Sequence, residues 1–226
     1  MNIYDYKDSK YSSHRILLDF AKTSKVTSGN CLDVGCASGF LSFKLAEIGL
    51  RVKGVDPNLP TELLGVAHNP IFEKATLLQL SDQRFGLIVA GDVIEHLEDA
   101  TSNMNKLREL LEDDGELLIS IPNAVNIYVR LHILSGRFDY KNRGPLDRTH
   151  LRFYTLKTFE QLLKNSGFIL REIRYAPFPA YQFLGQRAKY FNSIIMIGLN
   201  LFAHLLPSLF AYQFVYRVTK YIPKVS

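Results

Sequence analysis

Short apolar runs alternate with helix-like patterns through the first half of the chain, and this alternation constrains the fold more than any other feature. The apolar runs lie at residues 31–34, 51–55, 87–90 and 116–121. Helical patterns separate them at residues 39–48 and 100–111. Strands that alternate with helices usually pair in parallel, and helices then cover both faces of the sheet. The sequence therefore predicts an α/β fold with a mostly parallel sheet.

The remaining segments add strands and helices to this sheet. A third strand is expected within residues 71–80, and two strand-like runs at 168–175 and 210–219 are expected to pair as an antiparallel edge hairpin. Further helices are predicted at residues 11–21, 61–66, 124–134 and 155–166. The prediction is a seven-stranded sheet with a helical insertion before its last strand.

The length of 226 residues suits one such domain. We expect a single domain over residues 1–226. Its parts are expected to be a leading helix at 10–24, a cofactor-binding core at 31–168 and a helical insertion or lid at 177–207.

The formal net charge of +5 is concentrated at the C-terminal end, where seven Lys and Arg face one acid from Arg171 onward. Such an end suits anionic lipid, a phosphorylated substrate or nucleic acid, or it is simply solvated. An Arg-rich helix with interleaved aromatic residues is absent, so no nucleic acid partner is expected. A small-molecule partner is therefore expected to be anionic or lipid-linked.

Two further features bear on the compartment. Cys31 and Cys36 are the only cysteines and lack metal-binding spacing, and the first ten residues do not form an apolar signal. We therefore predict a cytoplasmic protein. From Tyr190 to Tyr216 the chain has no charged residue, but polar residues and Pro207 interrupt it. We expect residues 187–206 to form a lid, a homodimer surface or a peripheral membrane contact rather than a membrane span.

The segment DVGCASG at residues 33–39 follows an apolar strand and precedes a helix. Its small residues allow a sharp turn and close approach of a ligand. Dinucleotide binding and S-adenosylmethionine (SAM) binding both suit such a bend, but Ala37 replaces a glycine that pyrophosphate binding favours. Asp56 ends the next strand, where its carboxylate can accept hydrogen bonds from a ribose diol.

Two later blocks decide between these readings: FGLIVAGDVIEHL at residues 85–97 and DDGELLISIPN at 113–123. With them the chain resembles the class I SAM-dependent methyltransferases over about residues 31–168, which implies a Rossmann-like fold. The resemblance implies that the cofactor contacts Asp33, Gly35, Cys36, Ala37, Gly39, Asp56, Gly91 and Asp92. An acidic or amide residue for the adenine cannot be placed between Glu73 and Asp82.

Glu95 and His96 are the catalytic candidates, together with His150. A histidine can orient an acceptor hydroxyl and take its proton. The pair resembles part of a magnesium or manganese site in ubiquinone-pathway and small-RNA O-methyltransferases, so Asp92, Glu95 and His96 could hold a metal with His150, although our prediction assigns none. Alternatively, Glu95 caps the following helix and His96 only shapes the pocket.

Residues 137–154 form the predicted acceptor loop, which is rich in Lys and Arg. Its end, DRTHLRFY, resembles a segment of bacterial methyltransferases associated with polysaccharide or lipid-linked sugar pathways. Alternatively, Asp147 and Arg152 pair to order the loop. The function predicted is SAM-dependent O-methylation of a small molecule or lipid-linked saccharide. The alternatives are N- or C-methylation and a SAM-binding regulatory or assembly protein without turnover.

Overall fold

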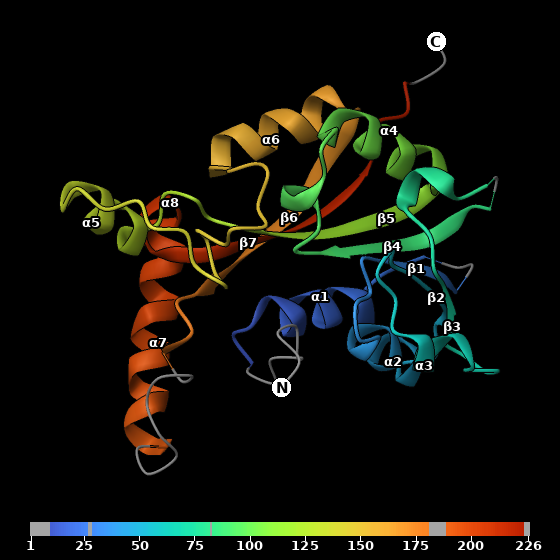
Figure 1. Ribbon diagram of the computed structural model, residues 1–226, viewed down its shortest axis with the longest axis horizontal. Helices are drawn as coiled ribbons and strands as arrows, with labels where there is room; N and C mark the ends of the chain where they lie inside the picture. The colour runs from blue at the N-terminus through green and yellow to red at the C-terminus, as the bar shows by residue number, and fades with distance from the viewer. Residues whose placement is uncertain (1–9, 27–28, 82, 181–188, 224–226) are drawn as a thin grey trace.

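In the computed structural model, which describes residues 10–26, 29–81, 83–180 and 189–223, seven strands form one sheet with helices on both faces (Figure 1). The strand order is β3-β2-β1-β4-β5-β7-β6, with β7 antiparallel to both neighbours and the other pairs parallel. The strands are β1 (Asn30–Val34), β2 (Arg51–Val55), β3 (Ile71–Glu73), β4 (Phe85–Gly91), β5 (Leu111–Pro122), β6 (Phe168–Pro177) and β7 (Ala211–Lys220). This is the predicted fold class.

The helices also follow the predicted pattern. They are α1 (Ser13–Lys22), α2 (Phe40–Glu47), α3 (Thr61–Leu64), α4 (Ala100–Leu110), α5 (Ile127–Leu134), α6 (Leu156–Asn165), α7 (Lys189–Leu205) and α8 (Pro207–Phe210). Two 3₁₀ turns complete the elements: η1 (Leu77–Gln79) and η2 (Ile94–His96). The break at Pro207 separates α7 from α8, as expected of a proline that begins a helix. That residues 1–226 form a single domain stays a prediction.

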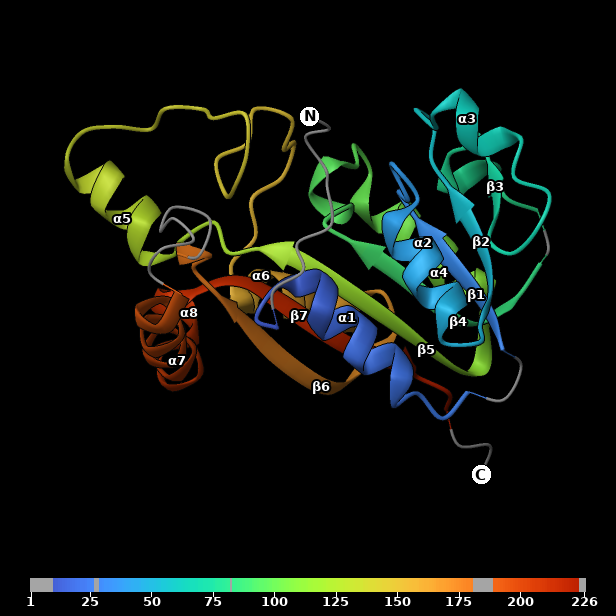
Figure 2. The same ribbon diagram turned by 90° about the horizontal axis from the view of Figure 1, so that it is seen from below.

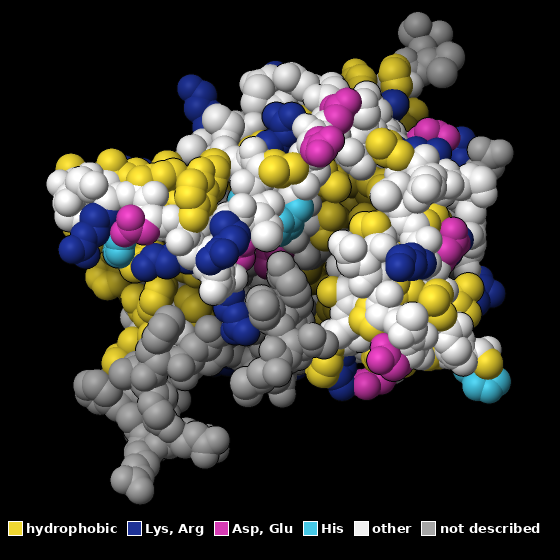
Figure 3. Space-filling model, viewed as in Figure 1, with side chains coloured by type: hydrophobic (Ala, Val, Ile, Leu, Met, Phe, Trp, Pro, Cys, Tyr) yellow, Lys and Arg dark blue, Asp and Glu magenta, His cyan; other side chains and the backbone are white. Residues whose placement is uncertain are grey.

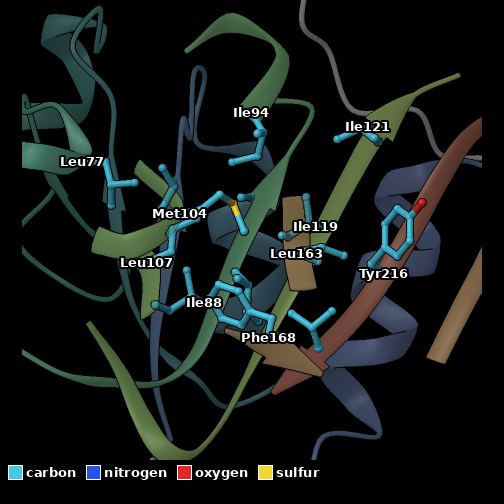
Figure 4. Packing of buried hydrophobic residues seen from close by; sticks show 14 of the residues in the cluster. Leu77, Ile88, Ile94, Met104, Leu107, Ile119, Ile121, Leu163, Phe168 and Tyr216 are labelled. Atoms are coloured by element: carbon cyan, nitrogen blue, oxygen red, sulfur yellow. The ribbon is translucent and has the colours of Figure 1, made fainter. Parts of the chain in front are cut away.

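Helices cover the two faces of the sheet in different ways (Figures 1 and 2). On one face, Met104 and Leu107 of α4 and Leu163 of α6 pack against Ile88, Ile119 and Tyr216 of the strands (Figure 4). On the other face, α1 and α2 cover a second cluster that includes Leu17 and Leu45. Because both faces are covered, every residue of β4 from Phe85 to Ala90 is buried.

The carboxyl ends of β1, β2, β4 and β5 lie along one edge of the sheet, because these strands are parallel. The register extends this edge to the antiparallel hairpin: Pro122 of β5 pairs with Gln213 of β7, and Pro177 of β6 pairs with Ala211. The end of β6, the start of β7 and the helices between them therefore stand at the same edge as the bend after β1. Ligands of open α/β sheets bind at this edge.

The start of one strand differs from the prediction. Strand β5 begins at Leu111, five residues before the predicted strand, because Leu111 pairs with Phe85 before an irregularity restores the register at Leu87 and Glu116. The predicted insertion also includes residues 181–188, which lie outside the described part. Among the described residues, no helix is long and apolar enough to cross a membrane.

Candidate functional site

The bend after β1 needs glycine at its two predicted positions. Gly35 and Gly39 adopt left-handed conformations, with φ of +68° and +75°. A Cβ atom on Gly35 would lie 2.6 Å from Cγ2 of Val93, and one on Gly39 would lie 2.7 Å from Cζ of Phe72. Close packing against β3 and the turn after β4 therefore fixes the bend, in addition to the backbone geometry.

The N–H groups of the bend are already engaged inside the protein. Those of Gly35 and Cys36 donate to the Val55 carbonyl at 2.8 and 3.2 Å, and that of Ala37 donates to Oδ2 of Asp56 at 3.0 Å. These donors are not available to a pyrophosphate group. The contacts do place the Asp56 carboxylate at the bend, where the sequence predicted a ribose-binding acid.

Asp33 lies behind the bend rather than on its surface. Its side chain is buried, and Oδ2 accepts a hydrogen bond of 2.6 Å from the Ser42 hydroxyl of α2. Burial raises the pKa of Asp33 to about 7, against the lowering effect of the Ser42 hydrogen bond. Burial likewise raises the pKa of the Cys36 thiol, which disfavours its reactive thiolate form.

The end of β4 holds Asp92 in a strained conformation. Its φ is +56°, a region that residues other than glycine rarely adopt, and it directly follows Gly91, the last residue of the strand. Oδ1 accepts from the Ser120 hydroxyl at 2.7 Å, and Oδ2 accepts from Nε2 of Gln213 at 2.6 Å. The carboxylate therefore joins β4, β5 and β7. Sequence reasoning missed Gln213, which is 121 positions away.

The structure brings the three catalytic candidates together. Glu95 and His96 lie on η2, and His150 comes from the loop before α6. One potential ligand atom from each lies within 4.8 Å of the others, with Nε2 of His150 at 4.0 Å from Oε1 of Glu95. Figure 3 shows histidine side chains bordering a hollow on this face of the molecule. We call these three residues the Glu95 cluster.

Glu95 is buried, and within the described chain neither of its carboxylate oxygens has a hydrogen-bond partner. Its pKa is raised well above the usual range, first by burial and then by the charge of Asp92. The pKa of His150 is lowered, first by burial and then by the neighbouring His96. A buried carboxyl without a partner is costly, so this group suits a ligand that the chain itself does not supply.

The ring of His96 is oriented by the acceptor loop. Its Nδ1 lies 3.1 Å from the carbonyl oxygen of Thr149, so a neutral ring donates from Nδ1 and keeps its lone pair on Nε2. Oδ1 of Asp147 in turn accepts from the N–H and the hydroxyl of Thr149 at 2.9 and 2.7 Å. The loop therefore fixes which nitrogen of His96 can accept a proton.

Two alternative interpretations of these residues are wrong. Asp99, not Glu95, caps α4: its side chain accepts from the N–H of Ser102, and Asp at the position before a helix is a strong cap. Asp147 does not pair with Arg152. Arg152 donates instead to the Glu98 carbonyl, and its own N–H, like that of Leu151, donates to the Glu95 carbonyl. Backbone bonds to η2 therefore order the loop.

The Glu95 cluster has the donor set of a divalent cation site. One carboxylate and two imidazoles suit several divalent metals, and the unpartnered oxygens of Glu95 leave coordination positions open. Asp92, which the sequence analysis grouped with Glu95 and His96, is committed to Ser120 and Gln213 instead. His150 is therefore the third potential metal ligand, beside Glu95 and His96.

The acceptor loop carries cations that lack partners. Arg137, Lys141, Arg143 and Arg148 form no ion pair within the described chain, and all four are exposed. No adenine-binding residue stands out after β3. Glu73 pairs with Lys53 at 2.7 Å, and Gln79 accepts hydrogen bonds from Thr76. Asp82 lies outside the described residues.

The chain matches a methyltransferase domain family over residues 6–173. It is 25% identical over 165 residues to the human mitochondrial ubiquinone biosynthesis O-methyltransferase, covering 66% of this chain and 45% of that protein. It is 28% identical over 162 residues to the ubiquinone biosynthesis O-methyltransferase of Rhodopseudomonas palustris, covering 67% and 63%. The chain thus spans about half to two thirds of the length of these relatives.

Solved structures share the fold at low sequence identity. A 1,6-didemethyltoxoflavin-N1-methyltransferase from Burkholderia thailandensis, with bound S-adenosylhomocysteine, aligns with a TM-score of 0.63 at 16% identity, covering 94% of this chain and 80% of that one. The magnesium protoporphyrin IX methyltransferase of Synechocystis aligns at 0.60 and 16%, covering 92% and 81%. These similarities concern the fold.

Proposed function

This chain belongs to the methyltransferase domain family, and we propose that it uses SAM to methylate an oxygen of a small-molecule acceptor. One juxtaposition carries the proposal. The bend that holds the Asp56 carboxylate and the turn that carries the Glu95 cluster meet at one edge of the sheet, where Gly35 packs against Val93. A cofactor at the bend would therefore lie next to ionisable groups that can bind an acceptor.

The residues of the bend fit SAM better than a dinucleotide. The N–H groups of Gly35, Cys36 and Ala37 bind Val55 and Asp56, so these three are not donors for a pyrophosphate, whereas the Asp56 carboxylate can still accept hydrogen bonds from a ribose. In this proposal Gly35, Cys36, Ala37 and Gly39 contact the methionine part, Asp56 holds the ribose, and Gly91 and Asp92 close the site. Asp33 supports the bend from behind through Ser42. When bound, SAM supplies an activated methyl group on a sulfonium centre.

The Glu95 cluster would act on the acceptor. Nε2 of His96 carries the lone pair of a ring that Thr149 holds in place, so it can accept the proton of an acceptor hydroxyl. The hydroxyl oxygen would displace the sulfonium sulfur at the methyl carbon, so the carbon–sulfur bond would break and S-adenosylhomocysteine would leave. Burial keeps His150 neutral near physiological pH, which makes it a hydrogen-bonding group for the same acceptor. A divalent cation on the cluster is the second candidate, because the carboxylate oxygens of Glu95 lack a hydrogen-bond partner within the described residues.

The acceptor itself is proposed to be anionic, because unpaired cations line the loop that leads to His150. Lipid-linked saccharides and other lipid-linked anions belong to this class. We also propose that residues 187–206 contact a membrane or a second copy of the chain, because Ile197, Leu201 and Leu205 of α7 are exposed. Residues 187–188 lie outside the described chain.

The O-methyltransferase names of the sequence relatives favour oxygen as the acceptor atom, and the N1-methyltransferase name of one structural neighbour makes nitrogen the alternative. A SAM-binding protein without turnover is the alternative of another class. Methyl transfer from labelled SAM to extracted metabolites, followed by mass spectrometry of the products, separates these cases. Loss of transfer upon chelation, restored by Mg²⁺ or Mn²⁺, would assign the cluster to a metal.

Calorimetry with SAM, S-adenosylhomocysteine and NAD tests the cofactor. Asp56→Ala should weaken SAM binding by about 1 to 3 kcal/mol, because it removes charge-assisted bonds to the ribose. Asp19→Ala, which removes an exposed acid of α1, is the matched control and should bind SAM normally. Unchanged affinity in Asp56→Ala, or binding of NAD in place of SAM, contradicts the proposal.

A further inference from the structure

Helix α5 exposes most of its apolar side chains. Val129 is fully buried, but Leu131 and Leu134 have 57% and 82% of their surface exposed. The residues that follow continue this pattern with the exposed rings of Phe138 and Tyr140, whose centroids are 5.8 Å apart. Soluble proteins seldom leave so many large apolar groups together on the surface without a partner.

Cations interleave with these apolar groups. Arg137, Lys141 and Arg143 are exposed and form no ion pair within the described residues. Figure 3 shows Lys and Arg beside hydrophobic side chains at the end of the molecule that carries α5. We define the α5 surface as Leu131, Leu134, Arg137, Phe138, Tyr140, Lys141 and Arg143.

The α5 surface is held firmly at the edge of the sheet that carries the candidate site. Asn123, buried just after β5, donates from Nδ2 to the carbonyls of Ser208 and Ala211 at 3.1 and 2.8 Å. Its own carbonyl accepts from Asn126, the residue that caps α5. The start of α5 is therefore tied to α8, and both views place α5 and α7 at the same end of the molecule (Figures 1 and 2).

A chain of rings connects the α5 surface to the Glu95 cluster. The centroid of Tyr140 lies 6.5 Å from that of Phe153, which lies 6.2 Å from that of His150. His150 in turn stacks edge-on with His96 at 4.8 Å. An amphiphilic molecule held at the α5 surface would thus lie beside the residues proposed to act on the acceptor.

We propose that the α5 surface docks on an anionic lipid bilayer, from which a lipid-linked acceptor reaches the Glu95 cluster. The apolar side chains and rings would enter the interface, and the three unpaired cations would meet the lipid headgroups. The part of this proposal that concerns the lipid-linked acceptor rests on the proposed function. The docking of the α5 surface on the bilayer does not. It adds a second contact, with three cations of its own, to the exposed apolar side chains of α7.

Charge favours a bilayer over a protein as the occupant. The α5 surface has three cations, and the segment that carries them, residues 137–143, contains one acid, the exposed Asp139. A second copy of the chain would bring the same cations opposite themselves at a two-fold interface, which opposes dimerisation. Anionic headgroups neutralise all three.

Vesicle sedimentation of the full chain tests the docking. We expect binding to vesicles of phosphatidylcholine with phosphatidylglycerol and little binding to phosphatidylcholine alone. Replacing the three cations, as Arg137→Gln, Lys141→Gln and Arg143→Gln together, should weaken binding on the order of 100-fold. Leu131→Gln with Leu134→Gln should weaken it about 10-fold or more. Higher salt should weaken wild-type binding.

A matched control changes Ile71→Gln with Leu78→Gln, because these side chains are each 53% exposed but lie at the β3 edge of the sheet. This variant should bind vesicles like the wild type. The proposal is overturned if the wild type does not bind anionic vesicles, or if the control loses as much binding as Leu131→Gln with Leu134→Gln. It is also overturned if light scattering shows that Leu131→Gln with Leu134→Gln only dissociates a dimer.

If the protein binds vesicles but calorimetry shows no SAM binding, the result contradicts the proposed function and leaves the docking proposal intact.

Discussion

The bend after β1 and the Glu95 cluster meet at one edge of the sheet but are built differently. The bend is completed by the chain itself: its N–H groups bind Val55 and Asp56, and its glycines pack against neighbouring side chains. The cluster joins η2 to a loop more than fifty residues later and leaves a buried carboxyl without a partner within the described chain.

The two buried carboxyls at these places make the difference concrete. Asp33 accepts a hydrogen bond from Ser42, whereas neither oxygen of Glu95 has a hydrogen-bond partner among the described residues. A buried carboxyl with a local partner can be explained by folding alone, but one without a partner points to a molecule from outside. The bend is therefore preformed, whereas the Glu95 cluster leaves hydrogen-bonding capacity that we propose the acceptor or a metal fills.

The largest expected effect belongs to the acceptor side. His96→Ala should reduce methyl transfer about 10²- to 10⁴-fold, because it removes the nitrogen that we propose accepts the proton, while SAM affinity stays nearly unchanged. Single-turnover kinetics and calorimetry measure the two quantities separately. His68→Ala, an exposed histidine beside β3, should change neither. Equal loss of turnover and SAM affinity in His96→Ala would mean that His96 is structural.

Much of the fold follows from patterns that are local in sequence. The apolar runs of β1, β2 and β4 and the periodic helices α2, α4 and α6 were predicted within a few residues, because each covers a face of the sheet with its own side chains. The bend was predictable for the same reason, since its glycines adjoin the strand that they terminate. Helix starts were predictable where a capping residue precedes them, as Thr155 does for α6.

Contacts between distant segments were the ones that sequence reasoning missed. The predicted Glu95 cap overlooked Asp99, although Asp immediately before the predicted helix was the available signal. The hydrogen bonds from Gln213 to Asp92, and from Asn123 to α8, depend on strand register, which a single sequence specifies only after the sheet order is known. The grouping of His150 with Glu95 and His96 came from the resemblance, not from spacing.

The cofactor side offers the second-largest effect. Gly35→Ala should lower the free energy of unfolding by about 3 kcal/mol, because its Cβ meets Val93 at 2.6 Å and its backbone is left-handed. Gly29→Ala separates these two causes, since Gly29 has a similar φ of +67° but no atom within 4 Å of its Cβ. It should cost only about 1 kcal/mol. Urea unfolding measures both, and equal costs would remove packing as the reason for Gly35.

The smallest effect tests whether Glu95 lacks a partner in the free protein. Burial raises the pKa of Glu95 above its usual value of 4.5, so its contribution to stability is present below pH 4.5 and is lost as pH rises through the folded-state pKa. Glu95→Gln cannot ionise, so its unfolding free energy should rise relative to that of the wild type as pH increases above 4.5. Glu98→Gln, an exposed acid of the same turn, should not do so. If the unfolding free energies of the wild type and Glu95→Gln depend on pH in the same way, Glu95 already has a stabilising partner in the free protein. The Glu95 cluster would then be preformed, as the bend after β1 is.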